Sequence, residues 1–168
     1  MKALLLFLFL ISLLVANEHR LLLTGFTLHE NDYSDSGEKF NEFNYGAGYE
    51  YTTFKNYDEL YFATNITILK DSFSATQYTL SGSQNIRYEL IYGVDISIGL
   101  ALFIMYKEEN YRLQPEGGEV GYGFIPGAAP LASIYYKDFD VNVAYVPSFK
   151  YEEIATTGFM IVYFGWKL

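Results

Sequence analysis

The residues of this chain that could carry out chemistry near neutral pH are His29, Asp71 and Ser72. A histidine takes or gives a proton in this range. A carboxylate can orient the histidine, and a hydroxyl can act as a nucleophile or as an oxyanion donor. Such a cluster is recognised by its geometry and not by its sequence positions, and a histidine at a strand end is more often a simple polar residue. The three residues therefore form a site only if the fold brings them together.

The composition argues against several other kinds of site. The chain has no cysteine, which excludes disulfides, lipoprotein attachment and a cysteine-rich zinc site. It has only two histidines, His19 and His29, so we expect neither a bound metal nor a cofactor. With 20 acidic residues, 11 basic residues and a formal net charge of -9, the chain lacks a basic footprint for phosphates. We therefore expect no nucleic-acid partner.

The first 16 residues are typical of a secretory signal peptide. Met1 and Lys2 form a short positive start, and the run from Ala3 to Ala16 is apolar except for Ser12. This run is shorter than the roughly 20 apolar residues that a membrane-spanning helix needs. It fits the apolar region of a signal peptide, with cleavage expected after Ala16 and an uncleaved N-terminal anchor as the alternative. We therefore divide the chain into a signal peptide, 1–16, and one domain, 17–168.

The aromatic content favours a membrane protein. The chain contains 17 Tyr, 14 Phe and 1 Trp, which a soluble enzyme of this size would have difficulty burying. Transmembrane barrels place aromatic rings in girdles at the two membrane interfaces. Tyrosine suits this position because its ring lies in lipid while its hydroxyl stays near water. Together with the export signal, this indicates a protein of the outer membrane.

After the signal, the chain alternates between apolar and polar residues with a period of two, as β-strands do. The clearest example runs from Leu90 to Ile104, where large apolar residues alternate with small or polar ones. A membrane barrel turns the apolar face to lipid and the small or polar face to the lumen. A soluble, lipocalin-like barrel with an apolar interior is the competing interpretation. We predict eight strands, at residues 20–30, 43–54, 57–69, 75–88, 90–106, 123–136, 139–147 and 157–168.

The predicted connections alternate in length. Long or charged loops fall at 32–42, 107–122 and 148–156, and tight turns fall at Lys55-Asn56, Glu89 and Lys137-Asp138. Outer-membrane barrels have long loops outside the cell and short turns on the periplasmic side. If the first strand starts in the periplasm, His29 and Ser72 meet at the outer rim. Adjacent residues of a strand point to opposite faces, so Asp71 and Ser72 share the site only if the strand ends there.

Four segments resemble the lipid A palmitoyltransferase family: 39–51, 69–73, 124–134 and 144–147. They occur in the family's order and at closely similar spacing, and the resemblance covers most of the mature chain. It implies a monomeric, all-β, eight-stranded antiparallel transmembrane β-barrel that moves an acyl chain from a phospholipid donor to lipid A. The family's catalytic residues map onto three positions here. They are His29 as general base, Asp71 as its orienting partner or a headgroup contact, and Ser72 as nucleophile or hydrogen-bond donor.

The resemblance also implies a route for lipid entry. Pro130 and Pro147, on neighbouring predicted strands, match family prolines beside a lateral opening in the barrel wall. Proline cannot donate a hydrogen bond to the ladder, so two of them across one strand pair weaken it. Prolines that simply mark a strand end or a bulge are the alternative. A second family pair of prolines falls here at about Thr24 and Asn44, which puts a second opening in doubt.

A further implication concerns the length of the transferred chain. In palmitate-selective members a lumenal glycine forms the floor of the acyl pocket, and an ungapped count from Asp71 places that position at Ser83. Ser83 shares the predicted lumenal face with Ser81, so we assign both to the acyl-chain pocket. Burying a hydroxyl without a partner costs on the order of 1–3 kcal/mol. We therefore expect a preferred chain shorter than palmitate by one or a few methylenes.

Two other functions stay open at this point. A non-catalytic barrel that serves adhesion or structure would account for the acidic loops around 32–42 and 152–153. A lipid A deacylase would use a histidine and a serine at the rim for hydrolysis instead of transfer. The family also often carries an amphipathic helix before the first strand, and we expect none here because only Asn17 to His19 precede the predicted strand.

Overall fold

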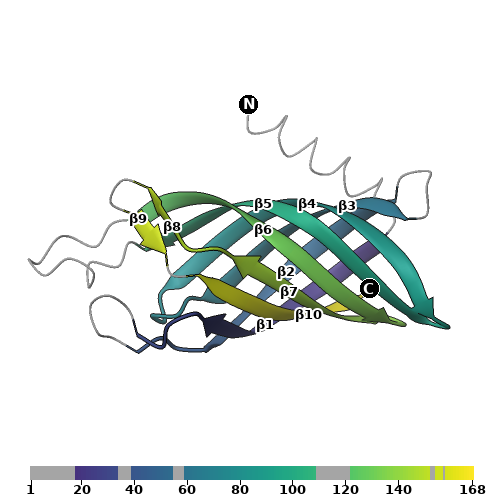
Figure 1. Ribbon diagram of the computed structural model, residues 1–168, viewed down its shortest axis with the longest axis horizontal. Coiled ribbons are helices and arrows are strands. Elements are labelled where there is room, and N and C mark those ends of the chain that lie inside the picture. The colour runs from purple at the N-terminus through teal and green to yellow at the C-terminus, as the bar shows by residue number, and fades with distance from the viewer. Residues whose placement is uncertain (1–17, 34–38, 55–58, 109–121, 152–153, 157) are drawn as a thin grey trace, which may run out of the picture.

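The computed structural model describes residues 18–33, 39–54, 59–108, 122–151, 154–156 and 158–168 (Figure 1). Regular structure in this part of the chain consists of β-strands. Across the described ranges we find no helix with the length and apolar character needed to cross a bilayer. The predicted signal peptide, 1–16, lies outside the described residues.

Eight strands form a closed barrel in the order β1-β10-β7-β6-β5-β4-β3-β2, and all neighbours are antiparallel (Figure 1). The predicted eight-stranded antiparallel barrel is therefore confirmed. A separate two-stranded hairpin, β8 with β9, lies in the loop before the last barrel strand and was not predicted, because three-residue strands are too short to show alternation. The strands are β1 Glu18–His29, β2 Phe43–Phe54, β3 Leu60–Lys70, β4 Thr76–Ile91, β5 Val94–Glu108, β6 Tyr122–Tyr136, β7 Phe139–Val146, β8 Phe149–Tyr151, β9 Ile154–Thr156 and β10 Phe159–Lys167.

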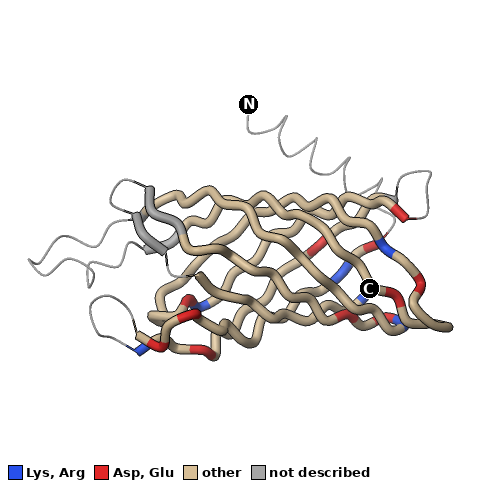
Figure 2. Tube along the Cα trace, viewed as in Figure 1, with Lys and Arg blue, Asp and Glu red and all other residues tan. Residues whose placement is uncertain are grey.

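The outer face of the barrel wall is apolar. On β5, Ile98, Leu100 and Leu102 point outward with more than half of their surface exposed, and the intervening Ala101 and Phe103 are buried in the lumen. Figure 2 shows that charged residues gather toward the two ends of the barrel and leave the middle of the wall largely free of them. A wall that presents such side chains outward is suited to hydrocarbon. A lipocalin-like barrel would have the reverse pattern.

Strand β1 contains a bulge between Thr24 and Phe26. Arg20, before the bulge, and His29, after it, both point into the barrel although nine positions separate them. Side chains of a regular strand alternate with a period of two, so an odd separation would put them on opposite faces. The extra residue of the bulge corrects the alternation. The exposed apolar residues of the strand accordingly lie on one outer face on both sides of the bulge: Leu21, Leu23, Phe26 and Leu28.

The β4–β5 hairpin turns at Tyr92 and Gly93, so the prediction of a turn at Glu89 is wrong. Glu89 pairs with Asp95 inside the ladder. Gly93 has a φ of 77°, a left-handed conformation that glycine adopts without steric cost. The prediction placed the turn too early because the apolar alternation runs on through it. The predicted turn at Lys137-Asp138 is confirmed, and Lys55-Asn56 lies outside the described residues.

Strands β6 and β7 are hydrogen-bonded along only part of their length. Their pairing stops at Leu131 and Ala144. Beyond this point β6 continues beside β5 as far as Tyr122, and β7 continues beside β10 as far as Val146. In the described part of the barrel, the two strands therefore separate toward the end at which β1 finishes. We call this separation the β6–β7 seam.

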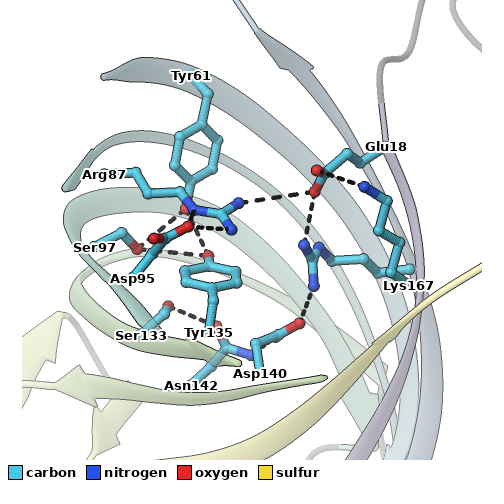
Figure 3. A network of polar contacts seen from close by, with 11 residues as sticks. Glu18, Tyr61, Arg87, Asp95, Ser97, Ser133, Tyr135, Asp140, Asn142 and Lys167 are labelled. Carbon is cyan, nitrogen blue, oxygen red and sulfur yellow. Dashed lines mark hydrogen bonds and ion pairs between the residues drawn. The ribbon is translucent and has the colours of Figure 1, made fainter. Parts of the chain in front are cut away.

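A polar network fills the lumen at the opposite end, near the C-terminus (Figure 3). Arg20 forms ion pairs with Asp140 and with Glu18, the latter at 2.6 Å. Figure 3 shows Arg87 and Tyr135 in the same group, and the guanidinium carbon of Arg87 lies 4.1 Å from the centre of the Tyr135 ring. Buried charges are tolerated when they are paired and hydrogen-bonded. The pairing therefore allows these charged side chains to remain buried in this end of the lumen.

The direction of the barrel in the membrane can be tested by surface labelling. With the start of β1 in the periplasm, the loops at 107–122 and 148–156 lie outside the cell. Epitope tags inserted in these loops should be accessible to antibody on intact cells, whereas a tag at Lys55-Asn56 should need permeabilised cells. The reverse labelling pattern would overturn this orientation and would place His29 on the periplasmic side.

Candidate functional site

The site begins with the turn that follows β3. This strand ends at Lys70, as the sequence requires if Asp71 and Ser72 are to share one site. The Asp71 side chain is buried, and its Oδ1 accepts hydrogen bonds from the backbone N–H groups of Phe73 and Ala75, both at 2.9 Å. A carboxylate that binds the backbone of its own turn in this way fixes the turn's shape. Asp71 therefore holds the segment on which Ser72 lies.

The structure brings His29 and Ser72 into contact across 43 residues of sequence: Ser72 Oγ lies 2.8 Å from His29 Nε2. The ring of His29 stacks on Phe40 with 4.1 Å between ring centroids and an angle of 12° between planes. Phe159 packs on the same ring with its centroid 5.8 Å away. These contacts fix the plane of the imidazole. A base within hydrogen-bond distance of a hydroxyl is the geometry that activation of a nucleophile or of a bound hydroxyl requires.

The polar groups of this site are of kinds that can take part in proton transfer. Among the described residues, no group of three or more His, Cys, Asp or Glu side chains is placed to hold a metal ion. Asp71, His29 and Ser72 all lie at the same end of the barrel, where β1 and β3 finish on either side of β2. The arrangement offers one base, one hydroxyl and one carboxylate to a molecule at this end of the lumen.

Asn44 is a fourth polar residue of the site, and the sequence analysis missed it. It comes from β2 and is buried; its Nδ2 lies 3.2 Å from Ser72 Oγ and 2.8 Å from Thr27 Oγ1. In the sequence, Asn44 is simply one of the polar residues on the lumenal face of its strand. Nothing there marks its contact with a residue 28 positions away. Its place beside Ser72 follows from the pairing of three strands.

The two residues just before β2 also hold the turn that follows β3 and close the wall next to it. The backbone N–H of Asn41 donates to the Ser72 carbonyl at 2.9 Å, and that of Thr27 donates to the Glu42 carbonyl at 2.8 Å. The second lateral opening that the sequence analysis placed in doubt would lie between β1 and β2. In the described residues, this strand pair instead stays hydrogen-bonded up to the site.

The lumen changes character below the site. Next to the site it is lined by an apolar cluster, and further from it by the polar network of Figure 3. The predicted pocket residues Ser81 and Ser83 are buried on the lumenal face of β4. Ser83 pairs with Ala101 on β5, which pairs in turn with Ala129 on β6. Through these ladder pairs Ser83 is linked to Ala129, a member of the apolar cluster, which consists of Phe103, Met105, Ile125, Ala129 and Val146.

The Ser83 hydroxyl has a partner, which corrects one step of the sequence argument. Ser83 Oγ accepts a hydrogen bond from Asn85 Nδ2 at 2.8 Å, and Ser81 Oγ donates to Asn65 Oδ1 at 2.8 Å. The cost assigned to an unpartnered hydroxyl therefore does not apply. What remains is the steric effect, because serine has a Cβ and an Oγ that glycine lacks. Gly99 opposite Asn85 allows this packing, since a Cβ at Gly99 would collide with the Asn85 amide.

Pro130 and Pro147 both lie at the β6–β7 seam. Pro130 points outward from β6 just beyond the last residue paired with β7, and Pro147 directly follows β7. An apolar groove of about 700 Å³ adjoins the seam on the outer face of the barrel. Tyr145 lines this groove, and its hydroxyl donates to Glu30 Oε1 at 2.6 Å. The seam is therefore linked to the residue that follows His29.

The fold is shared with a protein of known structure. The crystal structure of Neisserial surface protein A (NspA) superposes with a TM-score of 0.62. The two chains are 14% identical, and the match covers 90% of this chain and 96% of the other. At this level of identity the likeness concerns the fold alone. It agrees with the closed eight-stranded barrel described above.

Sequence comparison identifies the family. Lipid A acyltransferase PagP of Methylobacillus flagellatus is 29% identical over 122 residues, which make up 71% of this chain and 58% of that protein. The match thus spans less than two thirds of the relative's length. A family model described as "Antimicrobial peptide resistance and lipid A acylation protein PagP" matches residues 11–166. As that match takes in all the strands of the barrel and the site at its rim, this chain belongs to the PagP family.

Proposed function

We propose that this protein is an outer-membrane acyltransferase that moves a fatty acyl chain, palmitate or somewhat shorter, from a phospholipid to lipid A. The observation that carries the proposal is the 2.8 Å contact between His29 Nε2 and Ser72 Oγ. It occurs at the rim of a membrane barrel in a chain of the PagP family. The printed name of the relative, a lipid A acyltransferase, supports lipid A as the acceptor.

In this mechanism His29 is the general base, and the Ser72 hydroxyl is either the nucleophile or a donor to the ester carbonyl. The ester bond between the acyl carbon and the phospholipid glycerol breaks, and a new ester forms with a lipid A hydroxyl. The proton of that hydroxyl passes through His29 to the glycerol oxygen that leaves. Asp71 contributes by holding the turn of Ser72, through its bonds to two backbone N–H groups, and it offers a carboxylate near the headgroups.

The lumen fits an acyl chain that hangs from this site. Both substrates are amphiphiles, so their headgroups lie at the rim while one chain extends into the barrel. The apolar cluster provides a surface for that chain, and the ion pairs of the polar network lie below it. Charged groups that already pair with one another gain no stabilisation from contact with an alkyl chain. The acyl pocket therefore ends where the apolar lining ends, near the level of Ser83.

A lipid can reach the lumen through the β6–β7 seam. There, β6 and β7 no longer share ladder hydrogen bonds, and Pro130 has no N–H to offer. The apolar groove on the outer face leads a chain from the bilayer to the seam. The structure thus supports an entry route at the two prolines singled out in the sequence, Pro130 and Pro147, rather than a purely local role for them.

The proposal as a whole is tested by mass spectrometry of lipid A from cells that express the protein. Transfer adds the mass of one acyl chain to lipid A. A loss of one chain would identify a deacylase instead, and unchanged lipid A in cells that contain folded barrel would favour a non-catalytic role. The donor is identified in the same samples, because each transfer leaves one lysophospholipid behind.

The site is tested by alanine variants. His29→Ala and Ser72→Ala should abolish transfer in folded barrels, with stability changes of roughly 0.5 kcal/mol, the usual range for rim positions. Asp71→Ala should also lose transfer, and it should lower stability by about 1–3 kcal/mol because two backbone N–H groups lose their acceptor. His19→Ala is the matched control, since His19 contacts Tyr49 at the other end of β1. Transfer by folded His29→Ala protein would refute the catalytic assignment.

The entry route is tested with an engineered disulfide, which the absence of native cysteine makes simple. Ala129 and Val146 belong to one cluster of buried side chains, and they stand on β6 and β7 two residues beyond the last pair of the ladder, Leu131 and Ala144. Ala129→Cys combined with Val146→Cys should lose transfer on oxidation and recover it on reduction. The control combines Ala132→Cys with Val143→Cys, which joins the strands where they already pair. If the oxidised seam variant keeps its rate, lipid enters elsewhere.

The pocket floor is tested by changing Ser83. Ser83→Gly removes a Cβ and a hydroxyl from the lumenal face and should lengthen the preferred acyl chain by one or a few methylenes. The assay offers phospholipids of graded chain length and measures the transferred chain. Gly82→Ser is the matched control, because a side chain there points outward into open space and should leave the preference unchanged. An unaltered preference in Ser83→Gly would show that the floor lies elsewhere.

A further inference from the structure

The side-chain amide of Asn44 lies between two hydroxyl groups. Its Nδ2 donates to Thr27 Oγ1 at 2.8 Å and to Ser72 Oγ at 3.2 Å. An amide NH₂ has two hydrogens and no acceptor capacity, so both hydroxyl oxygens must act as acceptors toward it. Ser72 Oγ therefore already receives one hydrogen before His29 is considered.

This donation sets the direction of the hydrogen bond between Ser72 and His29. A serine hydroxyl carries a single hydrogen. With an N–H directed at its oxygen from the Asn44 side, that hydrogen is left to point at His29 Nε2, 2.8 Å away. The imidazole then accepts at Nε2 and carries its own proton at Nδ1. This is the arrangement in which His29 can withdraw the hydroxyl proton.

We infer that Asn44 is a positioning residue, which directs the Ser72 hydroxyl toward His29 and selects the His29 tautomer that acts as a base. The kinetic part of this inference rests on the proposed acyl transfer, while the tautomer of His29 does not depend on it. Asn44 does not act on the substrate itself in this proposal. It acts through Ser72.

The surroundings of Asn44 make it suited to this task. Its side chain is 5% exposed, so water does not compete for its amide hydrogens. The bond to Thr27 anchors one of its two hydrogens on β1. The backbone bond from Asn41 to the Ser72 carbonyl holds the acceptor turn in place, and stacking on Phe40 fixes the His29 ring. Each partner in the chain from Asn44 to Ser72 to His29 is thus held by a separate contact.

The substitution Asn44→Asp isolates this effect. Aspartate keeps the shape of the side chain but only accepts hydrogen bonds when ionised. Thr27 and Ser72 would then donate to residue 44, and the Ser72 oxygen would accept from His29 Nε2–H. We expect kcat to fall on the order of 10- to 100-fold, up to the lower limit of the roughly 10²- to 10⁴-fold that general-base catalysis contributes, with KM nearly unchanged. Asn41→Asp is the matched control, because it adds the same charge three positions away and keeps the backbone N–H that donates to the Ser72 carbonyl, while the side chain there bonds to Phe43.

The His29 tautomer provides a readout that does not need activity. The chain has only two histidines, so ¹⁵N-labelled histidine gives ring signals from His19 and His29 alone, and a His19→Gln background assigns them. The spectrum is recorded on folded barrel in detergent micelles at about pH 9, well above the usual histidine pKa of roughly 6.5. We expect the Nδ1–H form in the unmodified protein and in Asn41→Asp, and a shift to the Nε2–H form in Asn44→Asp.

The two measurements separate the possible failures. If the unmodified protein transfers no acyl chain, the proposed function fails, and the tautomer of His29 still decides the role of Asn44. If transfer occurs but Asn44→Asp keeps both kcat and the Nδ1–H form, the inference about Asn44 is overturned and the proposed function stands. A loss of kcat without a change of tautomer would also overturn it, because Asn44 would then have only a structural role.

Discussion

The closed hydrogen-bond ladder is the constraint on which the rest of this structure depends. In hydrocarbon each backbone N–H and C=O must be satisfied within the protein, and a closed barrel achieves this without free edges. The hydrogen-bonded partners of Leu22 can be followed around the wall in either direction. Through β2 they lead to Ile125 on β6, and through β10 they lead to Tyr135 on the same strand, ten positions away. This stagger tilts the strands. It also determines which strand ends meet at the rim. The ladder is interrupted at the β6–β7 seam.

The two halves of the lumen differ in polarity and therefore in what they can do. Near the C-terminus the side chains are charged and paired, with Arg20 of the first strand bound to Asp140 of β7, both of them buried. Such a network is costly to break, since removing one partner of a buried ion pair typically costs 3–5 kcal/mol. Near the rim the lumen is apolar and is bordered by the seam, so it can admit a guest molecule. The rigid half fixes the register of the strands, and the apolar half is left for a ligand.

Much of this molecule could be predicted from alternation along single strands. Eight strands and the meeting of His29 with Ser72 followed from counting strand ends on one side of a membrane. What could not be predicted depends on contacts between strands. The partner of the Ser83 hydroxyl and the position of Asn44 beside the site are set by cross-strand register, which a single period-two pattern does not reveal. The turn at Gly93 was missed for a different reason, since apolar residues continue through it in phase.

Because of its bulge, β1 is more sensitive to the insertion or deletion of a residue than to substitution at its outward positions. Arg20 anchors one end of the lumen and His29 serves the other, and they share a face only because one extra residue lies between them. Loss of a single residue there would turn one of the two toward lipid, whereas an exchange of one outward apolar residue for another would change little. In the divergence of this family, the outward positions of β1 should therefore accept exchanges among apolar residues, and the strand should accept length changes only in compensating pairs. Sequence alignments that shift β1 by one position would exchange the lumen for the membrane.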